Sequence, residues 1–397
     1  MRILISTIAI KDRPTGVFSR GFNLAKGLVK LENQVTFLTT QDKGFNFPYS
    51  KEVRDGVLII AVPSFFSFKI KKFGYDFMPI LLKTFYILFK NYDIVHSDLY
   101  RPSSLLPCII HRFFHKSLVI SDWQDINGRT GLYNSKSKIW KWTIGPFDNW
   151  LELYSKKISD GIIALSEPLK LKTKDLNISK AYKLWGGSDL DKIKFYKSSL
   201  TNRKLFNLSK DDFIIVFIGL AMIDYEDNLS VFKAIQKSKN TGINITVVRT
   251  GKRYSEAFKA KHNIGDEILD LGYVDDRVYG KLLSCADACM LVQKENNNNL
   301  SRWPNVIGDY ITAGRPVILN PIGELAELRE IIPKVVLSLE SDDFSYLLKR
   351  FEDIYINRDQ LHERYEQIAE FAKEKFSWDI RSKELEEIYI STINVNR

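Results

Sequence analysis

The chain of 397 residues contains few cysteines, and this scarcity limits both its covalent and its metal chemistry. Three cysteines, Cys108, Cys285 and Cys289, are too few for a disulfide framework, so the sequence favours a reducing compartment. Cys285 and Cys289 are four positions apart with no second pair, which argues against a metal site. We expect both to pack at a buried corner between a helix and a strand.

Targeting and phosphate-binding signals are also sparse. The N-terminal segment MRILISTIAI lacks the long apolar run and the small-residue cleavage site of a signal peptide, so we expect it to form a first strand. The loop after it holds one glycine, Gly16, and the full Gly-x-Gly-x-x-Gly pattern is absent. The net charge of +10 attracts polyanions, but with no recognised nucleic-acid motif we expect no nucleic-acid partner.

What is present is the composition and alternation of an α/β protein. The chain is 45% hydrophobic and 27% charged, as in ordinary globular proteins, and its length suggests two domains. Apolar runs alternate with helical periodicity, which predicts parallel sheets. A segment with Gly186–Gly187 and several charges, Leu184–Ser199, is typical of a linker. The strands expected are 2–8, 35–38, 57–62, 94–97, 118–121 and 161–165 before it, and 213–218, 243–248, 268–271, 288–292 and 316–319 after it.

The segment Asn296–Asn320 carries the most specific signal. An Asn-rich loop precedes a helix that begins at Asn305, with Asp309 one turn in, and a buried strand follows. The amides of Asn305 and Val306 at a helix N-terminus can hold phosphate, and Asp309 can accept hydrogen bonds from ribose hydroxyls. The alternative is an ordinary helix with an exposed aspartate.

A cation is expected beside this helix. Arg302 lies just before its N-terminus, where a guanidinium can bind phosphate oxygens in a bidentate manner. The alternative is a surface arginine packed on Trp303.

A second group of candidates follows strands of the first half. Asp122 and Asp125 lie in a loop after a buried strand, and one of them can act as base or hydrogen-bond partner for an acceptor hydroxyl. Alternatively, Asp122 caps a turn and Asp125 is solvated. His96, near a strand end, is a further acceptor-side candidate or a structural histidine.

Two aromatic stretches leave a membrane question open. Phe65–Tyr92 mixes aromatics with lysines that include Lys71, Lys83 and Lys90, but its apolar run is too short to span a bilayer. A second stretch contains Trp140, Trp142, Phe147 and Trp150. Such surfaces suit an anionic membrane interface, whereas core helices with lysine ammonium groups reaching the solvent are the alternative.

Taken in order, these segments resemble glycosyltransferase family 4. The resemblance covers nearly the whole chain and rests on Gly16–Thr39, Ser159–Ser166, Trp185–Leu190, Gly272–Val292, Pro304–Pro316 and Phe376–Trp378. It implies an α/β GT-B fold, with two Rossmann-like domains whose parallel sheets face a central cleft. The implied boundaries are 1–185 for the acceptor domain, completed by a helix at 377–397, 186–202 for the linker, and 203–376 for the nucleotide-sugar domain.

The resemblance also implies an activity, with two departures. The family transfers a sugar from a nucleotide-sugar, usually with retention and without a metal or other cofactor. In its Glu-x7-Glu motif, Asp309 takes the second position, which implies ribose binding, but Ser301 takes the first, which normally contacts the donor sugar. The family's basic pair after the first strand of the second domain is also absent, so the diphosphate needs another cation. Arg302 is the first candidate and Lys252 the second.

The sequence therefore predicts a glycosyltransferase that moves sugar from a nucleotide-diphosphate sugar to a glycan or lipid-linked acceptor. The acceptor side contains Gly16, His96, Asp122 and Asp125. We expect a cytoplasmic protein, peripheral on the inner face of the cell membrane if the aromatic surface binds lipid. The alternatives are a nucleotide-sugar epimerase on the same fold and a non-catalytic nucleotide-sugar-binding subunit.

Overall fold

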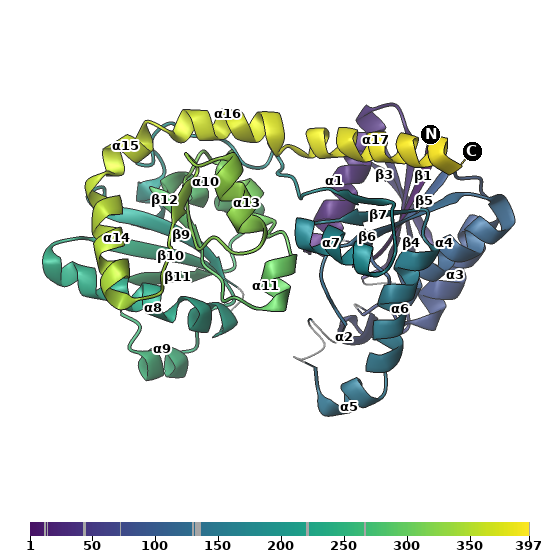
Figure 1. The fold of residues 1–397 in the computed structure, drawn as a ribbon, viewed down its shortest axis with the longest axis horizontal. Helices are drawn as coiled ribbons and strands as arrows, with labels where there is room; N and C mark the ends of the chain where they lie inside the picture. Colours follow the sequence, from purple (N-terminus) through teal and green to yellow (C-terminus); the bar gives the residue numbers. More distant parts are fainter. Residues whose placement is uncertain are drawn as a thin grey trace. The chain divides into compact units, whose positions relative to one another are not determined.

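Two compact units make up the protein (Figure 1). The computed structural model describes residues 1–11, 13, 15–42, 45–71, 73–128, 131, 136–219, 222–265 and 267–396, without the side chains of 69–70, 222–226, 276 and 396. Unit 1 comprises Met1–Gly187, Ser301–Trp303 and Trp378–Arg397, and unit 2 comprises Ser188–Leu300 and Pro304–Ser377. The predicted linker, 186–202, lies almost wholly in unit 2.

Unit 1 is built on an eight-stranded sheet. Its strands are β1 (Arg2–Ile10), β2 (Gln34–Thr40), β3 (Ser50–Arg54), β4 (Val57–Val62), β5 (Ile94–Ser97), β6 (Leu118–Trp123), β7 (Gly161–Ala164) and β8 (Ala181–Lys183). They lie in the order β3-β4-β2-β1-β5-β6-β7-β8, and β3 pairs antiparallel with β4 while the other described pairs are parallel. The strands β2, β3 and β4 therefore lie on one side of β1, and β5 to β8 lie on its other side.

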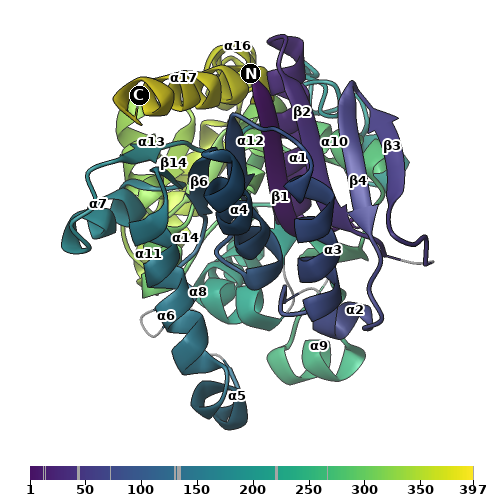
Figure 2. The same ribbon diagram turned by 90° about the vertical axis from the view of Figure 1, so that its right-hand side faces the viewer.

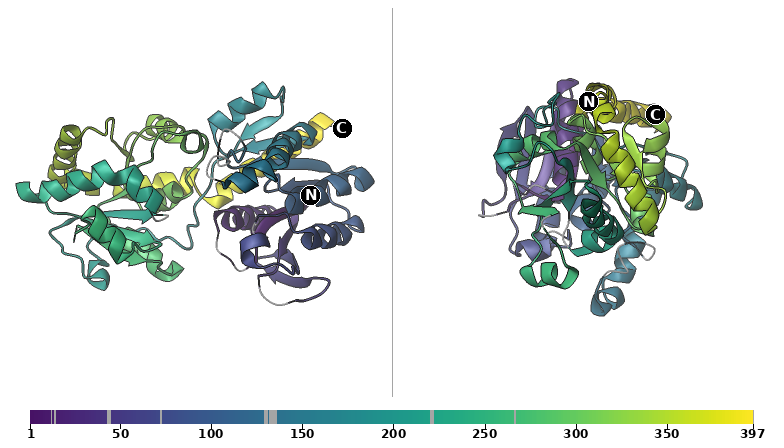
Figure 3. Two further views of the ribbon diagram at one scale, coloured as in Figure 1. Left: turned by 90° about the horizontal axis from the view of Figure 1, so that it is seen from below. Right: turned by 90° about the vertical axis from the view of Figure 1, so that its left-hand side faces the viewer.

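Helices cover both faces of this sheet. They are α1 (Gly16–Lys30), α2 (Phe68–Lys71), α3 (Phe77–Leu88), α4 (Pro102–His115), α5 (Lys138–Trp142), α6 (Gly145–Ile158), α7 (Glu167–Asp175) and α17 (Trp378–Asn396). Because side chains alternate along a strand, Ile3 and Ile5 of β1 belong to the cluster that contains Leu385 of α17, while Leu4 belongs to the one that contains Ile87 of α3. Figure 2 shows α1, α3, α4 and α17 around the strands of this sheet. The C-terminal helix α17 is thus part of the core of unit 1 (Figure 3).

Unit 2 is built on a six-stranded parallel sheet. Its strands are β9 (Phe213–Gly219), β10 (Ile245–Gly251), β11 (Ile268–Gly272), β12 (Ala288–Leu291), β13 (Val317–Leu319) and β14 (Val336–Ser338), in the order β11-β10-β9-β12-β13-β14. The near-continuous apolar run of β9, FIIVFIG, is typical of a parallel strand with both faces covered. The strands β10 and β11 extend the sheet on one side of β9, and β12 to β14 extend it on the other. The strand order therefore reverses at the centre of the sheet, between β9 and β12, and we call this point the crossover.

Helices surround the sheet of unit 2, and some of their side chains, such as Phe232 and Phe351, share one core cluster with it. They are α8 (Met222–Ser238), α9 (Glu256–His262), α10 (Asp276–Cys285), α11 (Asn297–Ser301, whose last residue groups with unit 1), α12 (Val306–Thr312), α13 (Glu324–Ile331), α14 (Phe344–Ile356), α15 (Arg358–His362) and α16 (Tyr365–Lys375), with short 3-10 helices at Arg203–Phe206 and Lys239–Thr241. Gly314 ends α12 with φ +74°, a left-handed conformation that a side chain disfavours. After this turn the chain enters the sheet as β13.

The predicted strands are all present, most with bounds within two residues of those expected. Three short strands, β3, β8 and β14, were not predicted, because each has too few residues to show a clear apolar pattern. The segment predicted as a polar loop before Arg302 instead forms the helix α11, so that expectation was wrong. Cys285 and Cys289 are buried at the end of α10 and in β12, which confirms the expected helix–strand corner.

Candidate functional site

The crossover of unit 2 is the natural place for a ligand. The chain leaves β9 toward one side of the sheet and β12 toward the other, and ligands of open α/β sheets bind beyond the carboxyl ends of the strands at such a point. Gly219 is the last residue of β9. Tyr310 of α12 fills the gap between the two strands, because its hydroxyl accepts from the Ile218 amide at 3.2 Å and donates to the Met290 carbonyl at 3.3 Å. The helix α12 is thereby held over the crossover.

Asp309, on the first turn of α12, is bound by hydroxyl groups. Its Oδ2 accepts a hydrogen bond from Tyr279 Oη at 3.1 Å, and its Oδ1 accepts one from Ser188 Oγ at 3.3 Å. Burial raises the pKa of this carboxyl to about 6, an effect that the Tyr279 hydrogen bond partly offsets. Above that pH, each carboxylate oxygen retains lone pairs that can accept further hydroxyl donors.

The expected phosphate-binding amides precede Asp309. The helix begins at Val306, one residue later than predicted, and Asn305 is its N-cap residue, whose side chain makes no capping hydrogen bond. Within the described part of the chain, the amides of Asn305 and Val306 have no hydrogen-bond acceptor. The first turn of α12 therefore has free donors, as helix N-termini do in general.

Ser301 and Arg302 belong to unit 1, although they precede α12 in sequence. Ser301 is buried, and its carbonyl accepts a hydrogen bond from Ser166 Oγ. The buried Nε of Arg302 has no partner among the described residues. The indole of Trp303 stacks on Trp185 with ring centroids 4.8 Å apart.

The two predicted acids of unit 1 have contrasting surroundings. Asp122, at the end of β6, is 2% exposed and forms an ion pair with Arg20 of α1. Asp125 lies beyond the strand, and no described residue makes a hydrogen bond to its carboxylate. Burial raises the pKa of Asp125, and the positive charge of Arg302 partly offsets that rise. Asp125, rather than Asp122, has oxygens free to meet a substrate.

The other acceptor-side candidates differ in accessibility. His96 is buried, and its Nδ1 lies 2.5 Å from Tyr389 Oη of α17. Burial lowers the pKa of His96 to about 4, so the ring is neutral at pH 7 and its surroundings favour the structural alternative. Gly16 is exposed at the first position of α1, where Thr15 Oγ1 caps the helix by accepting from Phe18 N at 3.2 Å.

One buried cation of unit 2 was not predicted. Lys252 is exposed just beyond β10, whereas Arg249 of the same strand is 0% exposed and lies at the carboxyl edge of the sheet. Its Nη1 donates to the Lys252 carbonyl at 2.8 Å and to Asp270 Oδ1 at 3.2 Å. A charged side chain within the apolar run ITVVRTG is the signal that could have revealed it.

The aromatic stretches of unit 1 present two exposed surfaces. On α3, Phe77, Leu81, Phe85 and Phe89 form a stripe at helical spacing and are 59–75% exposed. The expectation that Lys71 and Lys83 join this surface was wrong, because both side chains are buried and donate hydrogen bonds to backbone carbonyls. The second surface, on α5 and α6, combines aromatic with basic residues; it consists of the exposed Lys138, Ile139, Trp142, Phe147 and Trp150 and the half-buried Lys141.

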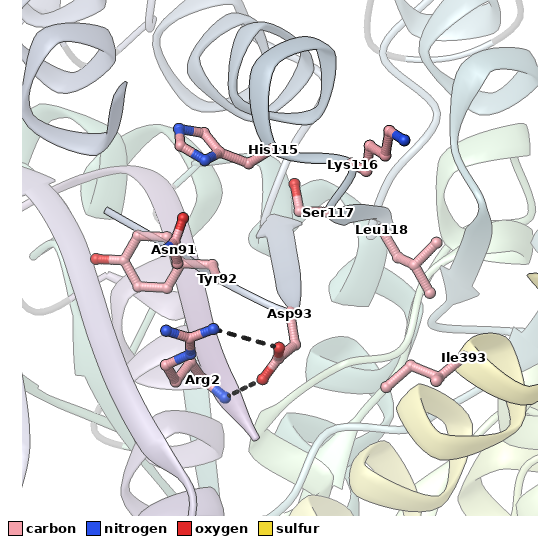
Figure 4. Close-up of a pocket in the computed structure, with 9 residues that line it drawn as sticks. All are labelled: Arg2, Asn91, Tyr92, Asp93, His115, Lys116, Ser117, Leu118 and Ile393. Atoms are coloured by element: carbon pink, nitrogen blue, oxygen red, sulfur yellow. Dashed lines mark hydrogen bonds and ion pairs between the residues drawn. The ribbon is translucent and has the colours of Figure 1, made fainter. Parts of the chain in front are cut away.

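A cavity of about 280 Å³ lies at the amino ends of the strands of unit 1, opposite the carboxyl ends that carry Asp122 (Figure 4). Arg2 begins β1 and Asp93 precedes β5, so the cavity is at the amino ends of the strands. The Arg2 amide donates to Asp93 Oδ2 at 2.7 Å, and this bond ties the two strand starts together. We assign no part of the candidate site to this cavity, since ligands of open α/β sheets bind at the carboxyl ends.

Among the residues with described structure, no helix is both long enough and apolar enough to cross a membrane. No protein-family model matches the chain, and no curated protein matches it in sequence.

The fold, in contrast, matches solved structures over nearly its whole length. Sucrose-phosphate synthase from Thermosynechococcus elongatus superposes with a TM-score of 0.74 at 14% identity, covering 99% of each chain. HepE from Anabaena in complex with UDP-glucose gives 0.69 at 12%, covering 98% of this chain and 100% of that one. The catalytic domain of starch synthase IV from Arabidopsis thaliana, bound to ADP and acarbose, gives 0.68 at 12%, covering 99% of each chain. The predicted fold class is confirmed: the chain has the α/β GT-B fold with two Rossmann-like domains.

Proposed function

We propose that this protein is a glycosyltransferase that moves a sugar from a nucleotide-diphosphate sugar to a glycan or lipid-linked acceptor. The observation that carries the proposal is the position of Asp309 on α12, over the crossover of unit 2. Solved structures of the same fold contain UDP-glucose or ADP, which supports a nucleotide donor. Retention at the anomeric carbon, independence of metal, family 4 membership and a role in cell-surface polysaccharide or glycolipid synthesis complete the proposal.

The residues of unit 2 have the chemistry to hold a donor. The ionised Asp309 accepts hydrogen bonds from ribose hydroxyls, and the free amides of Asn305 and Val306 donate to phosphate oxygens. The nucleoside diphosphate is the leaving group, so donors fixed near its oxygens stabilise the charge that develops during transfer.

On the acceptor side, Asp125 is the carboxylate that we propose meets the attacking hydroxyl. No described residue makes a hydrogen bond to its carboxylate, and its raised pKa makes it a better proton acceptor than an ordinary aspartate. Asp122 then acts through its ion pair with Arg20, by fixing the end of β6.

A donor screen tests this proposal. Thermal unfolding with UDP-, GDP- and ADP-sugars identifies a donor by a raised Tm, since a ligand that binds only the folded state stabilises it. Transfer of labelled sugar to an acceptor extract then follows. Epimerised donor without transfer would identify the epimerase alternative, and binding without turnover the non-catalytic subunit, which the buried Ser301 in place of a glutamate favours. No binding of any nucleotide-sugar would refute the proposal.

We also propose that the α5–α6 surface binds anionic membrane on the cytoplasmic side of the cell. Trp142 is 86% exposed and Trp150 is 52% exposed, and lysines lie beside them. Co-sedimentation with phosphatidylglycerol vesicles should fall when both tryptophans are replaced by serine. Tyr273→Ser removes an 84% exposed aromatic of unit 2 and should leave binding unchanged. Equal loss in both variants, or no wild-type binding, would contradict this proposal.

A further inference from the structure

Arg249 has an anion-binding fork that the protein leaves open. Its guanidinium stacks 4.0 Å from the centre of the Tyr254 ring, and among the described residues Nη1 alone makes hydrogen bonds. Nε and Nη2 are buried and have no partner within the described ranges of the chain. Unpaired charged donors in the interior are costly, so natural proteins rarely retain them without a ligand or water to accept their hydrogen bonds.

The geometry of the open donors indicates which ligand fits. Nε and the neighbouring Nη2 form the edge of a guanidinium that pairs with two oxygens of one carboxylate or phosphate group. In unit 1, Arg20 uses the same edge to bind Asp122, with Nε to Oδ2 at 2.9 Å and Nη2 to Oδ1 at 3.3 Å. The corresponding edge of Arg249 therefore matches an oxyanion with two accessible oxygens.

The position of the fork points to the donor's phosphates. A Cβ built on Gly219 would lie 2.8 Å from Nε and 2.9 Å from Nη2 of Arg249. The open edge thus faces the end of β9, at the crossover where Tyr310 holds α12 in place. The bare backbone of Gly219 is what leaves room for the guanidinium there.

We propose that Arg249 binds the diphosphate of the nucleotide donor, from β10 rather than from the loop after β9. This inference rests on the proposed function and supplies the cation that the absent basic pair leaves missing. Because the guanidinium is fully buried, the incoming phosphate displaces part of the chain that covers the fork.

Arg315 provides a matched control within the same unit. It is also 0% exposed, stacks 4.0 Å from the centre of the Tyr365 ring, and has Nε and Nη1 without partners among the described residues. It precedes β13, however, and so lies at the amino edge of the sheet. Unpaired donors alone do not define a phosphate site, and the position at the crossover separates the two arginines.

Calorimetric titration with UDP, ADP and GDP, and with the corresponding nucleosides, tests the proposal. Arg249→Lys keeps the charge but removes the fork, and we expect it to weaken binding of the preferred diphosphate about 10- to 100-fold, as for loss of charged hydrogen bonds. Affinity for the nucleoside should stay unchanged. Arg315→Lys should leave both affinities unchanged.

Gly219→Ala gives a second route if Arg249→Lys does not fold. The added methyl group occupies the space beside Nε and Nη2 without altering any charge, so it should also weaken diphosphate binding selectively. Wild-type affinity for the diphosphate in either folded variant would overturn the assignment while leaving the proposed function intact. A wild-type protein that binds no nucleoside diphosphate would overturn both.

Discussion

Arg20 in unit 1 and Arg249 in unit 2 are both buried arginines at the carboxyl edge of a parallel sheet, yet they are paired differently. Arg20 binds the carboxylate of Asp122 through Nε and Nη2, and its remaining bonds go to the carbonyls of Leu184 and Trp185. With the described residues, Arg249 makes hydrogen bonds through Nη1 alone, to Asp270 and to the Lys252 carbonyl. All three guanidinium nitrogens of Arg20 therefore make hydrogen bonds within unit 1, whereas Nε and Nη2 of Arg249 have no partner among the described residues.

The acids of the two units show the complementary difference. Asp122 is neutralised by an arginine, whereas Asp309 receives its hydrogen bonds from the hydroxyls of Tyr279 and Ser188. In unit 2 it is Asp270 that forms the ion pair with a buried arginine, Arg249. The comparison fits a structural role for the Arg20–Asp122 pair and the ligand site that we propose at the crossover of unit 2.

The largest expected effect comes from breaking the pair in unit 1. Asp122→Ala leaves the Arg20 charge buried and unpaired, and we expect a loss of about 3–5 kcal/mol in the free energy of unfolding. Urea denaturation measures it. Asp379→Ala removes the exposed partner of Lys30 and should cost less than about 1 kcal/mol. Equal losses in the two variants would show that the Arg20 pair is not special.

A smaller effect concerns the pH dependence of Asp309. Its pKa in the folded protein, about 6, is above its ordinary value of 3.8, so the folded state binds the proton more tightly than the unfolded state. Its stabilising contribution is complete below about pH 4 and is lost as the pH rises through 6, by an amount on the order of 1–3 kcal/mol. The pKa of Asp98 is also raised to about 6, so stability measured from pH 4 to 7 should decline in both proteins, but less steeply in Asp309→Asn than in the wild type. Parallel curves would contradict the raised pKa.

The smallest expected effect tests which cation of unit 2 binds phosphate. Lys252 is exposed, and it is the carbonyl of Lys252 that accepts a hydrogen bond from Arg249. Lys252→Ala retains that carbonyl, so we expect no change in diphosphate affinity measured by calorimetry. A loss as large as that of Arg249→Lys would transfer the role to the lysine and leave the Arg249 fork without a function.

Local patterns were sufficient to predict much of the fold and one part of the site. The apolar runs at 57–62 and 94–97 coincide with β4 and β5, because a strand buried on both faces is marked by its own residues. The position of Asp309, one turn into a helix that precedes a strand, likewise follows from residues close in sequence. Its hydrogen-bond partners do not, since Ser188 and Tyr279 are far away along the chain.

By itself, the sequence determined the alternation of strands and helices, the two-domain α/β class and the location of α12 with Asp309. The tertiary structure alone decided which charged side chains are buried and which groups they pair with. Lys83 became buried because the Thr7 carbonyl lies within its reach, and Arg249 became a buried cation because β9 places a glycine beside it. Burial and pairing of a charge depend on which distant residues the sheet order brings next to it, and no local pattern encodes that order.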